Sequence, residues 1–140
     1  MKSVLDTDVL VAALRSATGA SREILNMVGR RELIVLASVP LMIEYEAVLK
    51  RPEHLQAANL TAQQVDTLLD VLVGLFVPVT PYFLWRPQMK DPNDEMVLEA
   101  AVNGQASAIV TFNTRHFSMA ASRFGIETLK PGEFLRRFVL

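Results

Sequence analysis

The chain has 140 residues, of which 51% are hydrophobic and 21% are charged, and its formal net charge is −1. This length and composition fit one ordered domain spanning residues 1–140 and exclude an intrinsically disordered protein. The chain has no cysteine, which excludes disulfide frameworks, thiolate metal sites and cysteine nucleophiles, so any bound metal must use mainly oxygen ligands.

Hydropathy and charge bear on location and on nucleic-acid binding. No stretch of 18 or more apolar residues predicts a membrane span, and the apolar run after Met1 is too short for a signal peptide. We therefore expect a cytoplasmic protein without a membrane partner. The net charge gives no overall attraction to phosphate, so binding to nucleic acid would need a local basic rim or a bound cation.

The first thirty residues predict one strand and two helices. A short apolar run predicts a strand over residues 2–6, and the acids at its end mark the start of a helix near Asp8. Residues 16–20 predict a loop. We expect Ser21 to cap the next helix and Gly29 to end it.

The middle of the chain predicts a second strand and two further helices. Residues 33–37 form the strand candidate, and Ser38 followed by Pro40 is typical of the start of a helix, here one that runs to about Lys50. Residues 61–64 form a capping-box pattern ahead of the most regular apolar stripe in the chain, which predicts an amphipathic helix over residues 62–76.

Strands and helices also alternate from residue 77 to the end of the chain. The first predicted elements are an edge strand or loop over 77–81, an irregular connection over 83–92, and a helix capped by Asn93 and closed by Gly104. A strand over 108–111, a turn over 113–116, a strand over 125–129 and a helix from Pro131 to Phe138 follow. Alternating strands and helices favour an α/β fold with a mostly parallel sheet covered on both faces. The isolated buried strands argue against the alternative, a helical bundle.

Ligands in open parallel sheets bind beyond the carboxyl ends of the strands, and three oxygen-bearing side chains could meet there. Asp6 ends the first strand, Asn113 follows the strand over 108–111, and Asp94 opens a helix. A simpler interpretation makes Asp8 and Asp94 ordinary acids of a first helical turn. Asp6 is different, because an unpaired charge between a buried strand and a buried helix is costly and calls for a partner.

The helix over residues 40–50 offers two further acids. Glu44 and Glu46 are two positions apart, so they project on opposite sides and cannot serve one site together. The apolar stripe of this helix consists of Leu41, Met42, Tyr45, Val48 and Leu49. Both glutamates flank it about equally, so periodicity alone leaves open which one turns toward the interior. Either could be solvated.

Taken together, these segments resemble a PIN domain, in particular the branch of toxin components of toxin–antitoxin pairs, the VapC-like ribonucleases. The matching segments are VLDTDVLV over 4–11, EYEAVLKRP over 44–52, DPND over 91–94, AIVTFN over 108–113 and PGEFL over 131–135. Their order and separations make the match specific over essentially the whole chain. The resemblance implies a three-layer α/β/α sandwich, selects Glu44 as the inward acid, and assigns Asp94 as a metal-binding acid.

The chain departs from this family at two positions. Many members carry an acid where this chain has Asn113, and where that residue is Asn an Asp often follows at the position held here by His116. The site would then have three carboxylates, and a second metal should bind more weakly. His116 could contact substrate phosphate or titrate, or it could be only a polar residue of the turn.

The resemblance implies a metal-dependent endoribonuclease that hydrolyses RNA phosphodiester bonds. Asp6, Glu44 and Asp94 would be catalytic and, with Asn113, would hold one or two Mg²⁺ or Mn²⁺ ions. The expected positioning or substrate-contacting residues are Thr7, Asp8, Asp91, Thr111, Arg115 and His116. The expected basic rim consists of Arg15, Arg22, Arg86, Lys90 and Arg115.

Two alternatives remain open at this point. A catalytically degenerate PIN-fold protein would bind RNA or a protein without cutting, which the missing fourth acid and the acidic isoelectric point favour. A small phosphatase with Asp6 as covalent nucleophile would also begin with an Asp-x-Asp motif, but the apolar segment after Asp8 gives it little support. The partners implied by the toxin branch are an RNA substrate, a cognate antitoxin and a second copy in a homodimer. The helix over 62–76 is the expected platform for the antitoxin or for the homodimer, and the alternative is that its broad apolar stripe belongs to the core.

Overall fold

The computed structural model describes residues 1–82 and 89–139, apart from the side chains of residues 138 and 139. Its centre is one five-stranded sheet in the order β3-β2-β1-β4-β5, in which every neighbouring pair of strands is parallel. The strands are β1 (Lys2–Leu5), β2 (Ile34–Ala37), β3 (Val77–Pro78), β4 (Ala108–Val110) and β5 (Glu127–Leu129).

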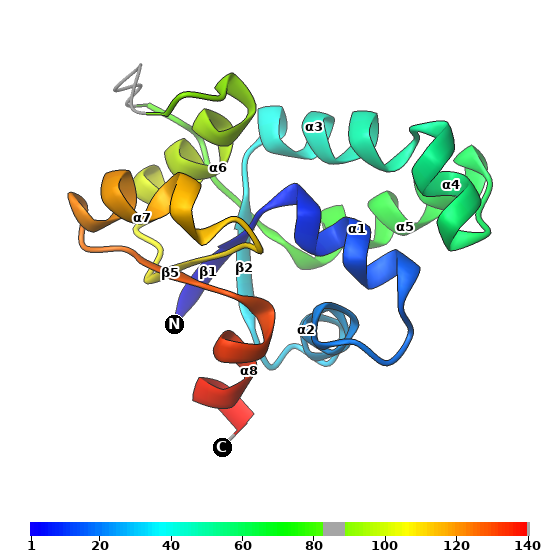
Figure 1. The fold of residues 1–140 in the computed structure, drawn as a ribbon, viewed down its shortest axis with the longest axis horizontal. Coiled ribbons are helices and arrows are strands. Elements are labelled where there is room, and N and C mark those ends of the chain that lie inside the picture. Colours follow the sequence, from blue (N-terminus) through cyan, green and yellow to red (C-terminus); the bar gives the residue numbers. More distant parts are fainter. Residues whose placement is uncertain (83–88, 140) are drawn as a thin grey trace.

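Helices cover both sides of this sheet. In Figure 1, α6 and α7 lie on one side of the strands, and α1, α3 and α5 lie on the other. The helices in the described ranges are α1 (Thr7–Arg15), α2 (Ala20–Gly29), α3 (Val39–Leu49), α4 (Pro52–Ala58), α5 (Ala62–Leu75), α6 (Pro92–Asn103), α7 (Thr114–Ser122) and α8 (Pro131–Val139). The predicted three-layer α/β/α fold is thus confirmed. None of the described helices combines the length and apolar character needed to cross a membrane.

Side-chain caps start α3 and α5 where the sequence predicts them. The Ser38 hydroxyl accepts a hydrogen bond from the Leu41 amide at 3.2 Å. At α5 the capping box is complete: the Thr61 hydroxyl accepts from the Gln64 amide at 3.1 Å, and the Gln64 side chain accepts from the Thr61 amide at 2.9 Å. These bonds satisfy amide groups that have no acceptor inside the helix.

The register between β1 and β4 brings distant residues together at the carboxyl end of the sheet. Leu5 lies opposite Val110, and the Asp6 amide continues the ladder by donating to the Val110 carbonyl at 2.9 Å. Asp6 and Thr111 therefore follow two neighbouring central strands. The sheet itself places them side by side, although 105 positions separate them in the chain.

Tyr45 ties helix α3 to this part of the sheet. Its ring is fully buried and packs edge-on against Phe76, with the two ring centres 6.5 Å apart. Its hydroxyl donates a hydrogen bond to the Leu5 carbonyl, the last of β1. A buried tyrosine hydroxyl requires such a partner, and here the partner is the residue next to Asp6.

Strand β3 forms one edge of the sheet, as predicted for residues 77–81. It has two residues, and Pro78 stands opposite Ala37 of β2. The ladder continues for one bond, from the Val79 amide to the Ala37 carbonyl at 3.0 Å. A proline in a strand is tolerated at such an edge because its missing N–H is needed only by a further strand.

Several helix starts differ from the prediction. Asp91, not Asn93, caps α6, because its carboxylate accepts from the Asn93 amide at 2.9 Å and Pro92 takes the first helical position. Helix α2 likewise begins before Ser21: Gly19 is its N-cap and offers no side chain. The predicted irregular connection over 83–92 falls largely on residues 83–88, which lie outside the described residues.

Two helices were not predicted. The predicted turn over 113–116 is wrong, since Thr114 is the first residue of α7. Most side chains of this helix are polar or small, and only Phe117, Ala120 and Ala121 are buried, so the sequence shows no clear apolar stripe. Helix α4 follows Arg51 directly and has no buried residue, so it leaves no apolar pattern to detect.

Candidate functional site

The carboxyl end of β1 presents Asp6 with both side-chain oxygens engaged. One oxygen accepts from the Thr7 amide at 2.8 Å, which makes Asp6 the cap of α1, and the other accepts from the Thr111 hydroxyl at 2.7 Å. Asp6 is only 7% exposed. A carboxylate held in this way is fixed in orientation, and each oxygen keeps a further lone pair for a cation.

Asp8 lies beside it in the first turn of α1 and reaches across to the segment after β4. One of its oxygens accepts from the Phe112 amide at 3.1 Å and from the Asn113 side-chain nitrogen at 3.2 Å. Its other oxygen is buried and has no partner among the described residues. The interpretation of Asp8 as an ordinary helix-terminus acid is therefore incomplete, because the side chain joins two segments of the fold.

The pKa values of these two acids are shifted by their closeness. Burial, and next the charge of Asp6, raise the pKa of Asp8 to about 7. Burial also raises the pKa of Asp6, although the hydrogen bonds from Thr111 and Thr7 act in the opposite direction. Ionising both carboxyl groups together is therefore unfavourable without a cation nearby.

Asp94 brings a third acid from the first turn of α6. Burial raises its pKa to about 6, and the charges of Asp6 and Asp91 add to the shift. His116 of α7 opposes it, with its Nδ1 atom 3.3 Å from an Asp94 carboxylate oxygen. The influence of Asp6 on Asp94 shows that the two acids lie near each other although they belong to different helix starts.

Helix α3 turns Glu44 toward this group and Glu46 away from it. Burial raises the pKa of Glu44, the Arg51 charge lowers it, and the charges of Asp91 and Asp6 raise it further. Glu46 is exposed, and its carboxylate lies 3.8 Å from the Lys50 ammonium group. Glu44 is therefore the acid of α3 that shares an electrostatic environment with Asp6, as the resemblance implies.

The donor chemistry of this cluster suits a hard divalent cation. In the part of the chain that the structure describes, no three acidic or histidine side chains converge closely enough to hold a metal as they stand. The cluster nevertheless supplies carboxylate oxygens that repel one another, and the second Asp8 oxygen is buried without a partner. A cation would relieve both conditions, so the residues fit a magnesium or manganese ion.

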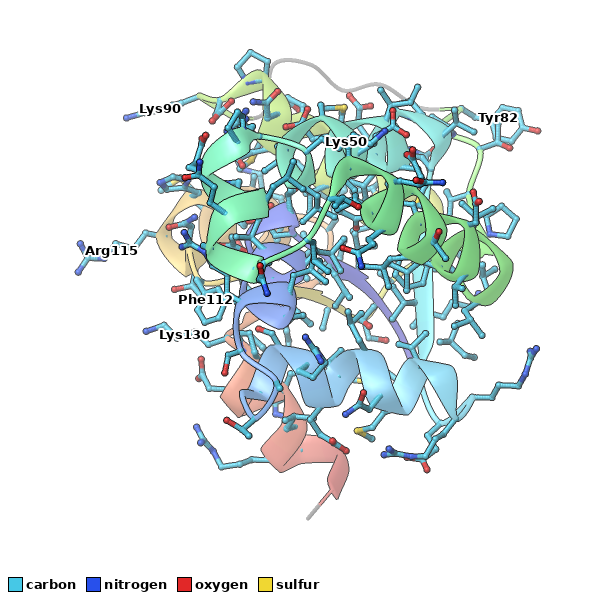
Figure 2. The ribbon with its side chains drawn as sticks, turned by 90° about the vertical axis from the view of Figure 1, so that its right-hand side faces the viewer. Lys50, Tyr82, Lys90, Phe112, Arg115 and Lys130 are labelled. Carbon is cyan, nitrogen blue, oxygen red and sulfur yellow. The ribbon has the colours of Figure 1, made fainter. Side chains whose placement is uncertain are left out.

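Part of the predicted basic rim reaches this cluster. Lys90 and Arg115 line the same cavity of about 470 Å³ as Asp94 and His116. Figure 2 shows Lys90 and Arg115 projecting from one side of the molecule. Arg22 is not part of this rim, because its Nε donates to the Ala13 carbonyl at 2.6 Å and its side chain lines a different groove.

The two other predicted rim residues add nothing to this cavity. Arg15 ends α1, on the exposed surface, and is absent from the cavity lining. Arg86 lies outside the described residues. Arg123 lines this cavity in their place, so the rim beside Asp94 consists of Lys90, Arg115 and Arg123.

Two residues of the site carried no assignment from the sequence. Tyr45 supports the Leu5 carbonyl next to Asp6, and the signal that could have revealed it is that a tyrosine in a buried stripe must find a partner for its hydroxyl. Phe112 donates its amide to Asp8 while its ring is 46% exposed. A bulky aromatic ring exposed directly after a buried strand is the signal that could have marked it.

Comparison with known proteins places the chain in a structural context. A family model described as PIN domain matches residues 2–115. A chain in the crystal structure of VapBC2 from Rickettsia felis bound to a DNA fragment from their promoter is similar, with 15% sequence identity and a TM-score of 0.62, over 93% of this chain and 98% of that chain. At this identity the likeness concerns the fold. No curated protein matches the sequence.

Proposed function

Because the chain belongs to the PIN-domain family, we propose that it is a metal-dependent endoribonuclease and the toxin of a toxin–antitoxin pair. The observation that carries this proposal is the acid cluster at the carboxyl end of β1 and β4. The charge of Asp6 raises the pKa of both Asp8 and Asp94, so these acids repel one another within one small region. Acids are maintained in such a costly arrangement where they bind a cation.

Each acid would have a distinct task. Asp6, Glu44 and Asp94 would hold one or two magnesium or manganese ions, and Asn113 would assist through its amide oxygen. A divalent cation at such a site lowers the pKa of a coordinated water and stabilises negative charge on phosphate oxygens. Thr111 holds the Asp6 carboxylate in place by its hydrogen bond.

The surrounding polar residues would position the acids and the RNA. Thr7 donates its amide to Asp6, and Asp91 caps the helix that carries Asp94. Arg115 and Lys90 would contact substrate phosphate from the cavity that Asp94 lines. His116 is 56% exposed at its side chain, so it can approach a substrate while it balances the Asp94 charge.

The test is cleavage of a fluorescent single-stranded RNA in magnesium, in manganese and in excess EDTA. The proposal expects cleavage that needs a divalent ion and is lost in Asp94→Asn. The matched control is Glu46→Gln, an acid of α3 that points away from the cluster and should leave cleavage unchanged. No cleavage in either metal, with no manganese binding, would contradict the proposal, whereas cleavage that persists unchanged in Asp94→Asn marks a contaminating nuclease.

One observation favours the alternative function, a PIN-fold protein that binds RNA or a protein without cutting RNA. The Asn113 side-chain nitrogen donates to Asp8, so this amide is already engaged within the site and adds no negative charge. Isothermal titration with manganese separates the two functions. A protein that binds no manganese and cuts no RNA would be a binding module, whereas manganese binding lost in Asp94→Asn supports the nuclease.

The antitoxin partner of this proposal would dock beside α5. The apolar stripe of α5 itself is core, since Val65, Leu69 and Leu72 are buried. A groove of about 610 Å³ lies between α5 and helices α1 and α2, lined mainly by leucines and by the exposed Val71. The similar chain belongs to a VapBC2 complex, which supports an antitoxin partner, and the apolar lining of this groove would suit a hydrophobic segment.

A homodimer would use the other side of α5. A second groove of about 420 Å³ lies between α3 and α5, with the exposed side chains Val39, Ile43 and Val73 at its rim. Val73→Glu should convert a dimer to a monomer in analytical ultracentrifugation, whereas Val71→Glu should leave it dimeric and weaken capture of the protein encoded by the adjacent gene. The opposite pattern would reverse the assignment of the two grooves.

A further inference from the structure

Helix α6 carries a second acid, Glu95, directly after Asp94. Neighbouring residues of a helix point in different directions, and Glu95 does not line the cavity that Asp94 lines. Its side chain is instead buried, with only 4% of the residue exposed. A glutamate is rarely buried to this extent unless other groups bind its carboxyl oxygens, so its contacts indicate what it does.

Glu95 binds a backbone amide that lies before the start of its own helix. One of its carboxyl oxygens accepts a hydrogen bond from the Met89 amide at 2.8 Å, across six positions of the chain. Met89 is itself only 9% exposed, so this bond lies in the protein interior. A buried amide outside helices and strands needs an acceptor, and Glu95 provides it.

The bond closes a loop that contains residues of the candidate site. Lys90, Asp91 and Asp94 all stand between Met89 and Glu95 in the chain. Asp91 is the N-cap of α6, and its carbonyl accepts from the Asp94 amide at 3.0 Å. Asp94 is therefore placed by the helix itself. Lys90 precedes the helix, and its position depends on how the chain is held at Met89.

The segment that Glu95 holds is one wall of the cavity beside Asp94. Met89, Lys90 and Asp91 line this cavity of about 470 Å³ on one side, and α7 and the residue after it line the other. Figure 2 shows Lys90 projecting from the molecule. Without an acceptor the Met89 amide would be buried and unpaired, which is costly, and the segment could satisfy it only by moving toward water.

We propose that Glu95 is a positioning residue for the substrate: by binding the Met89 amide, it fixes the cavity wall from which Lys90 meets the RNA. The inference rests on the proposed nuclease function, because it concerns the cavity through which RNA would reach the acids. Glu95 touches neither RNA nor a cation in this role. It controls how tightly RNA binds, whereas the acid cluster controls how tightly the cation binds.

The first test separates these two kinds of binding. Glu95→Leu keeps most of the side-chain volume but removes the acceptor. The KM for a fluorescent single-stranded RNA should rise about tenfold, with kcat changed less than about twofold, because the wall contributes equally to ground-state and transition-state binding. Manganese affinity in isothermal titration should stay the same, since α6 still places Asp94. A fall in kcat or in manganese affinity as large as the rise in KM would overturn the proposal.

A conservative variant and a control identify the bond responsible. Glu95→Gln keeps a carbonyl oxygen that can accept from the Met89 amide, so its KM should stay within about threefold of that of the unchanged chain. A Gln variant as impaired as the Leu variant would overturn the role of this bond. Thr61→Ala removes another side-chain bond to an amide, the cap of α5 at 3.1 Å, and should lower the unfolding temperature without changing KM. An equal rise in KM there would make the effect one of stability.

Amide hydrogen exchange followed by NMR tests the bond without RNA or metal. The Met89 amide should exchange at least about tenfold faster in Glu95→Leu than in the unchanged chain, because it loses its acceptor. The amides of β4 should keep their exchange rates in both chains. Equal exchange at Met89 in the two chains would show that Glu95 does not hold this segment.

The outcomes distinguish this inference from the nuclease itself. If the unchanged chain cleaves RNA and Glu95→Leu has the same KM, the nuclease stands and the positioning role falls. If the unchanged chain cleaves nothing, fluorescence anisotropy with a fluorescein-labelled oligouridine measures binding in place of KM. Binding about tenfold weaker in Glu95→Leu would then keep the positioning role although the nuclease falls.

Discussion

The acid cluster has two unequal halves. In the half formed by β1 and β4, Asp6 accepts two hydrogen bonds and Asp8 accepts bonds from the segment after β4, so the backbone register of the sheet fixes both. In the half formed by α6 and α7, Asp94 has one contact to an exposed histidine, His116. One half is held by the core of the fold and the other by two helix starts.

The difference indicates how such a site can be both precise and accessible. The half on the sheet sets the geometry, because its acid side chains cannot turn without breaking their hydrogen bonds to Thr7, Thr111 and Phe112. The half on the helices faces the cavity with Lys90 and Arg115, where substrate would enter. Rigid and adjustable ligands in one cluster would let a cation be held firmly while the phosphate is exchanged.

Lengthening each acid by one methylene tests this contrast most strongly. Asp6→Glu should lower RNA cleavage about 1,000-fold, equivalent to about 4 kcal/mol, because its carboxylate is locked by Thr7 and Thr111. Asp94→Glu should lower RNA cleavage only about tenfold, since the starts of α6 and α7 can shift to accommodate the longer side chain. The measurement is kcat/KM on one RNA, and equal losses in the two variants would show that the halves are alike.

Removing the support of Asp6 is expected to have the next largest effect. Thr111→Val deletes the hydroxyl that donates to Asp6 at 2.7 Å, so cleavage should fall about 10- to 100-fold and manganese should bind more weakly. The free energy of unfolding should fall by about 1–3 kcal/mol. Thr111→Ser keeps the hydroxyl, and a Ser variant as impaired as the Val variant would assign the effect to packing.

The repulsion between the acids should make metal-free stability depend on pH. The pKa of Asp8 is about 7 in the folded chain and 3.8 for an exposed aspartate, so the folded state binds a proton that the unfolded state has lost. This contribution to stability is complete below pH 3.8 and is lost progressively as the pH rises to about 7. The unfolding temperature without metal should therefore be about 5 °C lower at pH 8 than at pH 5.5.

Metal and one substitution provide the controls for that pH effect. Manganese should raise the unfolding temperature more at pH 8 than at pH 5.5, because only ionised carboxylates bind it. Asp8→Asn removes the acid whose pKa is about 7 and should reduce the pH dependence without metal, while Asp94 continues to titrate near pH 6. An equal unfolding temperature at pH 8 and at pH 5.5 would show that Asp6 and Asp8 do not repel each other.

The smallest expected effect concerns the histidine of the open half. His116 lowers the pKa of Asp94 by its charge and its hydrogen bond, so His116→Gln should raise that pKa and shift the acid limb of the activity profile to higher pH. Cleavage should fall about fivefold at pH 6 and less than twofold at pH 8. His54→Gln, in α4, is the matched control, and an equal loss at both pH values would instead make His116 a substrate contact.

Much of the fold could be predicted from the sequence because its signals are local. The short apolar strands, the capping box at Thr61 and the serine cap before α3 each depend on a few adjacent residues. Helix α7 escaped prediction because Asn113 provides no side-chain cap and its buried stripe is narrow. Helix α4 escaped because none of its residues is fully buried and only Leu55 packs against the core, which leaves no apolar stripe in the sequence.

The part of the site that follows from the order of the strands could be predicted from the sequence. The rule that ligands bind at the carboxyl ends of parallel strands is enough to bring Asp6 and Asn113 to one edge of the sheet. The choice between Glu44 and Glu46 needed the family resemblance, since both flank the same stripe. The bond from Phe112 to Asp8 spans 104 positions and involves a backbone amide, so no residue pattern could have revealed it.

The two-residue edge strand β3 also limits how other proteins can attach to this one. With Pro78 in its ladder, that edge lacks a donor that an incoming strand would need, so it cannot serve as a template for β-augmentation or for edge-to-edge aggregation. Recognition on that side of the molecule must then proceed through helical surfaces. A peptide selected to bind there should fold as a helix, and a β-strand mimetic should fail.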